Sequence, residues 1–332
     1  MSKLKIRNMK KVVLSLVLMI AAVTVSAQQI AVVSSSGATT MCQTLGDAIS
    51  KASSNSVIYL PAGGFQISDD VKISKKLTIV GVTHKANSDN VEGNTIISGN
   101  LNFVGGSDNS AVMGCYISGN VNIGYDESEI SGILIKYCNL NAVSVKGPNV
   151  TNTKILQNYI RDTPVFNYCS VVINNNIINS GVRYITGGEI SYNIFVDYDH
   201  YHGYVLSFVN DATINKNVFL YWTGHRGNNV QASGNLFKNN NWGDDSINLG
   251  LDYDDDLSTV FKKPLGCTPA SEYEFIDKYA VYNDQVGLYA GGSKFSEDCL
   301  PPVPYVSVKD IDEQTDAAGN LKVTLRVKAV SE

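Results

Sequence analysis

Short groups of apolar residues recur around an Asn or a Cys, with a spacing of about twenty residues. The segment ISGNLNF at 97–103 returns almost unchanged as ISGNVNI at 117–123. A looser template, apolar-x-x-Asn/Cys-x-apolar, continues this register, and its central residues are Cys115, Cys138, Asn158, Asn176, Asn193, Asn217 and Asn235. The steps between them vary from 17 residues (176 to 193) to 24 residues (193 to 217). A fixed template with variable steps indicates the turns of a coil joined by loops of different length.

This period predicts a coil of short parallel strands. It is too short for paired-helix repeats and too irregular for leucine-rich repeats. Stacked strands lie about 4.8 Å apart, so equivalent positions on successive turns form ladders along the coil. In such a ladder an Asn tolerates the left-handed backbone of a bend, and its amide can hydrogen-bond to the amide on the next turn. We therefore expect the ladder Asn residues to be structural, and Cys115 and Cys138 to be buried thiols in the same ladder.

The two ends of such a coil need cover because each exposes apolar interior. Apolar residues at 45–52 follow helical spacing, and Thr44 with Asp47 provides a start signal of the capping-box kind. Strand-like runs follow at 57–60, 71–73 and 77–82. Near the C-terminus, apolar and polar residues alternate over 321–328, which is typical of a half-buried strand in a hairpin. We expect the helix to cover the first turn and the C-terminal region to close the other end.

The segments TLGDAISKASSNSVIYLPAGGF (44–65) and KKLTIVGV (75–82), with the Asn ladder that follows, resemble the pectate-lyase-like family. The resemblance covers about residues 44–245. It implies an all-β fold, a right-handed parallel β-helix (solenoid), here with an N-terminal helical cap and a C-terminal β-hairpin cap. From Tyr282 onward the chain is also similar to C-terminal regions of secreted β-helix proteins from Bacteroidetes-type bacteria. The resemblance implies little about activity, because this architecture hosts lyases, hydrolases and adhesins.

The first residues predict export. A basic segment precedes an apolar run at 12–25 and the small residues Val25-Ser26-Ala27, in the order of a secretory signal. A membrane anchor is disfavoured because the run is shorter than the roughly 20 apolar residues of a spanning helix. We expect residues 1–27 to be a cleaved signal peptide, 28–245 to form the N-terminal cap and parallel β-helix, and 246–332 to form a C-terminal capping region. The mature chain would then have no membrane span and would be secreted or held in the cell envelope, in the periplasm or on the outer surface.

Export also changes the charge and the redox setting of the chain. The signal segment holds five of the 26 Lys and Arg and none of the 31 Asp and Glu, so 21 cations remain against 31 anions, a net charge near −10. Nucleic acid and anionic membranes are disfavoured as partners because both reward clustered cations. An acidic polysaccharide would need a local basic patch or a metal ion. Exported chains can form disulfides, and Cys267 and Cys299, which flank one C-terminal segment, are the best candidate pair.

Polar and aromatic residues follow successive ladder Asn residues at similar distances, which predicts a site on one flank of the coil. Arg183 lies 7 residues after Asn176, and Trp242 lies 7 residues after Asn235. The candidate ligand-binding residues are Arg183, Tyr198, His200, Tyr201, His202, Trp222, His225, Arg226, Trp242 and Asp244. Aromatic rings beside hydrogen-bonding groups suit sugar rings, which have an apolar face and a polar edge. The alternative is a set of ordinary surface loops whose aromatic residues pack over the coil.

The sequence assigns no catalytic residue and no metal ligand. The family's lyases would need carboxylates that hold Ca²⁺ and an Arg or Lys as base. Asp162 and Asp197 are expected two turns apart, about 9.6 Å, which is too far to share one ion. Ca²⁺ stays open as a cofactor only through the acidic run at 252–256, which lacks the glycine and terminal Glu of a twelve-residue calcium loop.

Three functions are compatible with this pattern. The leading hypothesis is a secreted or surface-displayed, non-catalytic protein whose coil presents the flank to a polysaccharide or host glycan. The alternative is a polysaccharide lyase or glycoside hydrolase that acts through His200, His202, His225, Arg226 and nearby aspartates. For hydrolysis, Asp197 with Asp199 and Asp244 with Asp245 are the plausible carboxylate pairs. The third is a purely structural envelope component.

Overall fold

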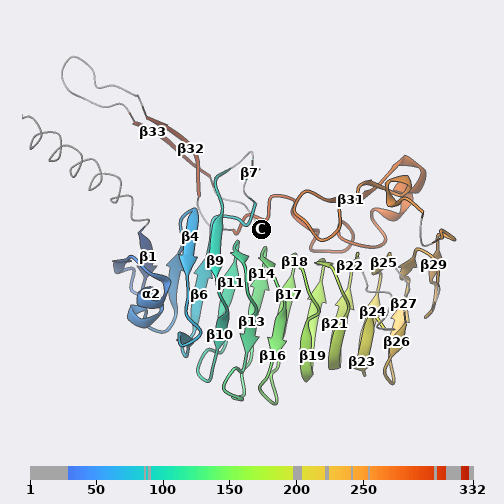
Figure 1. Cartoon of the computed structure of the whole chain (residues 1–332), viewed down its shortest axis with the longest axis horizontal. Coiled ribbons are helices and arrows are strands. Elements are labelled where there is room, and N and C mark those ends of the chain that lie inside the picture. Colours follow the sequence, from blue (N-terminus) through green and yellow to red (C-terminus); the bar gives the residue numbers. More distant parts are fainter. Residues whose placement is uncertain are drawn as a thin grey trace, which may run out of the picture.

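The chain forms an all-β solenoid of about eight turns with very few helices. This is seen in a computed structural model, which describes residues 29–85, 87–88, 91–196, 204–220, 224–240, 242–252, 255–302, 305–311 and 323–328. Successive turns lie side by side along the longest axis of the molecule, from β4 and β6 near one end to β27 and β29 at the other (Figure 1). The predicted coil of parallel strands is confirmed.

Each turn contributes three short strands, so the coil has three faces. Face 1 contains β5 (Lys72–Ile73), β10 (Leu101–Phe103), β13 (Val121–Ile123), β16 (Val143–Val145), the first parts of β19 (Val165–Asn174) and β21 (Val182–Ser191), β23 (Leu206–Asn210) and β26 (His225–Arg226). Face 2 contains β3 (Ser56–Tyr59), β6 (Leu77–Val80), β11 (Ala111–Met113), β14 (Leu134–Lys136), β17 (Thr153–Leu156), the second parts of β19 and β21, β24 (Thr213–Asn215) and β27 (Gln231–Ser233). Strands β19 and β21 run through both faces, so faces 1 and 2 form one sheet.

Face 3 is a separate ten-stranded sheet within the described residues. Its strands are β4 (Gly63–Gln66), β9 (Thr95–Ser98), β12 (Tyr116–Ile117), β15 (Asn139–Leu140), β18 (Tyr159–Ile160), β20 (Ile177–Ile178), β22 (Ile194–Phe195), β25 (Val218–Phe219), β28 (Leu236–Phe237) and β29 (Ile247–Asn248). All neighbours in this sheet are parallel and in register, as in the pairing of Ile117 with Ile97 and Leu140.

Apolar side chains at alternate strand positions fill the interior of the coil. On face 3 the inward position carries a column of rings in which Phe195, Phe219 and Phe237 stack with centroids 4.8 and 5.1 Å apart. These distances match the spacing between strands, so identical residues on successive turns pack without a gap. This explains why the template has an apolar residue two places after each ladder Asn.

The predicted Asn ladder is present and buried between faces 2 and 3. Asn158, Asn176 and Asn217 are fully buried, as are the other two ladder Asn residues. The backbone N and the side-chain Nδ2 of Asn158 donate to Oδ1 of Asn176 at 2.9 and 3.0 Å, and Asn217 donates to Asn235 at 2.9 and 3.1 Å. The Nδ2 of Asn176 also donates to the carbonyl of Ile155 at 2.8 Å. Partners on the next turn and on the strand therefore offset the burial of these amides.

One detail of this prediction was wrong, because the left-handed residue is the one before each ladder Asn. Gln157, Tyr192 and Lys216 have φ angles of 56°, 59° and 55°. The bend is completed one residue earlier, so the Asn can keep its amide inside the ladder. At Gly114, which holds this position on an earlier turn, an added Cβ would lie 2.4 Å from Cγ of Pro301. Glycine is required there for packing as well as for its φ of 66°.

Two cysteines extend the ladder as predicted. Cys115 and Cys138 are both fully buried, and the backbone N of Cys138 donates to Oδ1 of Asn158 at 2.9 Å. Burial raises the pKa of the Cys138 thiol to about 12. Both residues therefore act as small neutral side chains.

The proposed disulfide between Cys267 and Cys299 is wrong, since all six cysteines are unpaired. The Sγ of Cys267 lies 3.2 Å from the carbonyl of Ile160, and the Sγ of Cys299 lies 3.1 Å from the carbonyl of Ser296. Both cysteines belong to the apolar cluster on the outer side of face 3, but the two thiols contact different backbone carbonyls and no bond joins them. The positions of Cys267 and Cys299 at the two ends of one segment therefore did not show whether they form a disulfide.

The predicted helix near the first turn is α2 (Leu45–Lys51). The Oγ1 of Thr44 accepts the backbone N–H of Asp47 at 3.1 Å, which is the N-cap contact that the sequence indicated. Leu45, Ala48 and Ile49 are buried in the same core cluster as the strands. Before the helix, β1 (Ile30–Val33) pairs antiparallel with β2 (Thr39–Cys42) and β3.

The C-terminal region covers the side of face 3, which differs from the prediction that it closes the far end. Residues 257–301, here called the C-terminal strap, contain η1 (Leu257–Thr259), β30 (Phe261–Lys263), β31 (Glu272–Phe275) and η2 (Asp277–Tyr282). The strap returns along the coil: the backbone N of Gly287 donates to Lys216, and the carbonyl of Asp298 accepts from Thr83. In Figure 1 it runs over the tops of the strands from β25 back towards β9.

The outward side chains of face 3 explain why the strap lies there. Tyr159, Ile177, Ile194, Val218 and Leu236 are apolar and buried, and they share a second core cluster with the strap. On the strap side the cluster includes Val260, Phe261, Tyr273, Phe275, Val286, Leu288, Phe295 and Cys299. Face 3 is therefore apolar on both sides, and the strap keeps its outer side from water.

The predicted terminal hairpin is formed by β32 (Tyr305–Ile311) and β33 (Val323–Lys328), which pair antiparallel. It projects from the body near β4 and β9, at the side where the coil begins (Figure 1). Strand β32 contacts β8 (Val91–Glu92), which pairs with β7 (Asn87–Ser88). The hairpin is therefore far from the last turn that it was expected to close.

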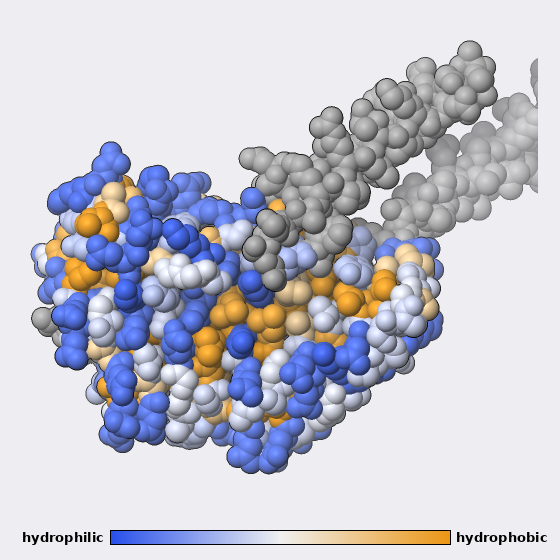
Figure 2. All heavy atoms as spheres, turned by 180° about the vertical axis from the view of Figure 1, so that it is seen from behind, coloured by the Kyte–Doolittle hydropathy of each residue, from blue (hydrophilic) through white to orange (hydrophobic). Residues whose placement is uncertain are grey.

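The outer surface mixes polar and apolar residues. From the side opposite to Figure 1, hydrophilic residues dominate, and apolar residues gather in a band across the middle (Figure 2). Among the residues that the structure describes, no helix has the length and apolar character of a membrane span. The predicted signal peptide, residues 1–27, lies outside the described residues.

Candidate functional site

The ten predicted ligand-binding residues separate into three groups. Five of them lie outside the described residues: Tyr198, His200, Tyr201, His202 and Trp222. Arg183 and Arg226 lie on the outer side of face 1. His225, Trp242 and Asp244 line a pocket at the last turn. The described residues thus form two neighbouring sites instead of one continuous flank.

Arg183 and Arg226 occupy the same outward row of face 1, two turns apart. Arg183 pairs with Ser207, and Ser207 pairs with Arg226. The predicted alignment of the two cations is therefore confirmed, and their α-carbons are about 9.6 Å apart by strand stacking. Among the residues that the structure describes, the guanidinium of Arg183 has no hydrogen-bond or ion-pair partner, and the side chain is partly exposed.

An aromatic ladder beside these cations was missed by the sequence analysis. Tyr168, Tyr184 and Phe208 stand next to one another on successive turns, with ring centroids 5.4 and 5.2 Å apart. All three have left-handed φ angles, between 55° and 61°. This local bend turns each ring outward although the next residue, as at Ile185, points into the core. The guanidinium of Arg226 covers the free face of Phe208 at 4.3 Å.

The same outward side continues towards the first turns with a second cation and ring cluster. Lys72 and Lys146, from turns on either side, place their ammonium groups 3.8 and 4.6 Å from the ring centroid of Tyr125. We call the whole set the face 1 strip. It consists of Lys72, Tyr125, Lys146, Tyr168, Arg183, Tyr184, Phe208 and Arg226. Its four cations contrast with the acidic balance of the whole chain.

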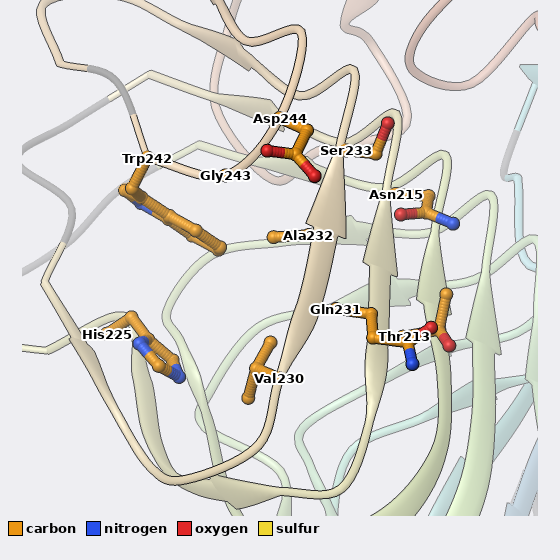
Figure 3. Close-up of a pocket in the computed structure, with 10 residues that line it drawn as sticks. All are labelled: Thr213, Asn215, His225, Val230, Gln231, Ala232, Ser233, Trp242, Gly243 and Asp244. Carbon is orange, nitrogen blue, oxygen red and sulfur yellow. The ribbon is translucent and has the colours of Figure 1, made fainter.

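At the last turn, His225 and Trp242 lie against each other in the wall of a pocket of about 600 Å³ (Figure 3). Their rings stack with centroids 5.5 Å apart. Trp242 also packs on Phe219 and Phe237, so it ends the column of rings inside the coil. It follows that Trp242 mainly closes the interior, which is the packing role that the alternative interpretation gave to these aromatics.

His225 takes an inward position, not the outward one that the sequence predicted. It pairs with Leu206, and Leu206 pairs with Val182, both of which are fully buried. Its Nε2 is buried and has no hydrogen-bond partner among the described residues, as is also true of Nε1 of Trp242. Burial lowers the pKa of His225, so the ring is neutral near pH 7.

Two of the carboxylates proposed for catalysis or metal binding have local structural roles. The Oδ1 of Asp162 accepts the backbone N–H of Thr163 at 2.7 Å, and Asp256 caps η1 through Ser258. Asp197 and Asp199 lie outside the described residues. Within the described part of the chain, no three His, Cys, Asp or Glu side chains are grouped as metal ligands would be.

Arg161, which the sequence placed near Asp162, has a structural role. Its guanidinium donates to the hydroxyl of Tyr116 at 2.9 Å and to the carbonyl of Ile117 at 2.8 Å. These contacts join three successive turns of face 3. Arg161 is therefore held in place and is not available as a base.

Comparison with known proteins gave no match to a family model, to a curated protein or to a solved structure. The parallel β-solenoid therefore rests on the chain's own strand register and Asn ladder.

Proposed function

We propose that this protein is an exported, non-catalytic β-helix protein that binds a polysaccharide along face 1. The observation that carries the proposal is the face 1 strip, in which two groups of cations and aromatic rings from several turns lie on the outer side of face 1. A polymer that lies parallel to the coil axis would meet a new ring or cation about every 4.8 Å. The rigid coil holds these groups in place, so little ordering would be needed on binding.

The chemistry of the strip suits sugars. Tyr168 and Tyr184 offer hydroxyl groups and ring edges, and Arg183 has unused N–H donors. Hydrogen bonds from a charged donor contribute about 1.5–3 kcal/mol each, so a few suffice for specific binding. The local positive charge also allows carboxylate- or sulfate-bearing units to approach, in spite of the net negative charge of the chain.

Other features of the proposal extend the sequence prediction. We propose a right-handed coil, because parallel strands joined by crossover connections are right-handed in nearly all proteins. We also propose that α2 serves as the N-terminal cap, which its burial against the first strands supports. Export by the signal segment would place the strip in the periplasm, on the cell surface or in the medium.

The test is a panel of neutral and acidic polysaccharides, with and without Ca²⁺, examined for binding and for products. Affinity electrophoresis measures retardation of the protein, while reducing ends and unsaturated uronates report cleavage. We expect retardation by at least one polysaccharide without new products. Release of products would support the lyase or hydrolase instead, and neither binding nor cleavage would favour a structural envelope component.

A further inference from the structure

The pocket at the last turn has two unlike walls that meet over strand β27. On the inward side lie the rings of His225 and Trp242 with Val230 and Ala232. On the outward side lie four polar residues of face 2, and Asp244 sits at the rim (Figure 3). The outward residues are Thr213, Asn215, Gln231 and Ser233. Its volume of about 600 Å³ lies within the roughly 300–1,000 Å³ of small-molecule sites.

Among the described residues, the polar side chains of this pocket have no hydrogen-bond partners, whereas two side chains at equivalent positions one and two turns earlier, Glu189 and Asn174, bond to each other. Earlier on face 2, Nδ2 of Asn174 donates to Glu189 at 3.2 Å, and Oδ1 of Asn174 accepts the backbone N–H of Ser191 at 3.1 Å. The strand register continues from Glu189 to Thr213 and Gln231, and from Ser191 to Asn215 and Ser233. In the pocket none of these side chains makes a hydrogen bond within the described part of the chain, and neither does the carboxylate of Asp244. The last two turns therefore present unused donors and acceptors to one space.

The rim is fixed by the backbone. Gly243 has a φ of 84°, and an added Cβ would lie 2.6 Å from both Cβ and O of Ala232. The backbone N of Asp244 donates to Ala232 at 2.8 Å, and its carbonyl accepts from Gly234 at 2.8 Å. These contacts hold the Asp244 side chain at the pocket without using its carboxylate.

We infer that this pocket binds a single neutral, hydroxyl-rich sugar unit, as a second site distinct from the face 1 strip. The ring wall provides an apolar surface for one face of the sugar, and the polar wall provides hydrogen bonds for its edge. Asp244 accepts hydrogen bonds from sugar hydroxyls, and no cation lines the pocket, so acidic sugars are repelled. This inference does not depend on polysaccharide binding by the strip.

The experiment uses ligand-observed NMR with glucose, galactose, N-acetylglucosamine and galacturonate as probes. We expect at least one neutral sugar to bind and galacturonate to bind at least about tenfold more weakly. In D244N, which keeps the shape of the side chain, affinity for the neutral sugar should fall about tenfold, because charged hydrogen bonds are lost. Affinity for galacturonate should not fall, since the repulsion is removed.

Two controls separate this site from other effects. E189Q changes a charge on the same face outside the pocket and should leave sugar affinity unchanged. Y184A alters the strip and should weaken polysaccharide binding but not binding of the single sugar. Absence of binding by every neutral sugar, or equal affinity in D244N and the unaltered protein, would overturn the inference. A strip that failed in polysaccharide binding would leave the sugar result standing.

Discussion

Asn176 donates twice to Oδ1 of Asn193, from its backbone N and from its side-chain Nδ2, both at 2.9 Å. One buried oxygen thus satisfies two buried donors of the preceding turn, and the pattern repeats along the ladder. Each turn is thereby tied to the next by side chains as well as by strand pairing.

Loss of one ladder amide should destabilise the coil. In N193A, the backbone N–H of Asn176 would stay buried without an acceptor, while its Nδ2 would keep the carbonyls of Ile155 and Asn174. We expect the free energy of unfolding to fall by about 2–3 kcal/mol. Denaturant titration followed by circular dichroism measures this. N167A, which removes an exposed amide bonded to the carbonyl of Lys146 on the preceding turn, should change it by less than about 0.5 kcal/mol. Equal effects of the two substitutions would show that the ladder has no special role.

The C-terminal strap should be held mainly by its apolar cluster with face 3. Phe261 is fully buried between Tyr273 and Phe275, with ring centroids at 5.4 and 4.7 Å. F261A should cost about 3–5 kcal/mol locally and speed amide exchange in residues 257–301, while the strands of face 1 stay protected. V281A, at an exposed position, should leave exchange unchanged. Uniform loosening of the whole chain in F261A would mean that the strap and coil unfold as one unit.

Stability should fall in acid because of His84. Its two ring nitrogens are buried without a partner among the described residues, and burial lowers its pKa from 6.5 to about 3. Below about pH 6.5 the unfolded chain binds a proton at His84 and the folded chain does not. Above pH 6.5 neither state binds this proton, so His84 does not lower the free energy of unfolding there. The free energy of unfolding therefore falls by about 1.4 kcal/mol per pH unit as the pH falls from 6.5 towards 3. Burial lowers the pKa of His225 as well, which acts in the same direction.

The variant H84F isolates this effect. A phenyl ring fits the edge-on contact with Tyr159, at 5.1 Å between centroids, and has no nitrogen to protonate. The slope of unfolding free energy between pH 4 and 6 should be shallower in H84F than in the unaltered protein. An identical slope would assign the acid sensitivity to other groups.

All six thiols should be free and shielded. Burial raises the pKa of Cys267 to about 12 and that of Cys169 to about 11, which suppresses the reactive thiolate. Without reductant, a thiol reagent should react slowly with the native protein and titrate six groups in denaturant. Four groups in denaturant would indicate a disulfide and contradict the structure.

The repeat predicted the ladder because its template is local and fixed. Asn158, Asn193 and Asn235 each directly precede a face 3 strand, whatever the length of the loops between them. The sequence also contains a signal for the strap. Each ladder Asn is followed by two apolar residues, as in Asn176-Ile177-Ile178, and a strand that is apolar on both sides needs cover on both.

The candidate site was harder to predict because it depends on loop length and on bends. Tyr168, Tyr184 and Phe208 lie 10, 8 and 15 residues after their ladder Asn, so counting from the ladder cannot align them. Their alignment arises from bulges in the pairing of β19 with β21 and from left-handed backbone at each ring. Counting also cannot tell an inward residue such as His225 from an outward one such as Arg226.

Polysaccharide binding by the face 1 strip is tested most directly by the affinity of a strip variant. The ligand is a polysaccharide that retards the unaltered protein in affinity electrophoresis. In R183A/R226A, we expect the dissociation constant to rise at least about tenfold, since each guanidinium contributes charged hydrogen bonds to the ligand. K263A, which removes an exposed cation from the C-terminal strap, should bind as the unaltered protein does. Unchanged affinity in R183A/R226A, with the fold intact by circular dichroism, would contradict polysaccharide binding by the face 1 strip.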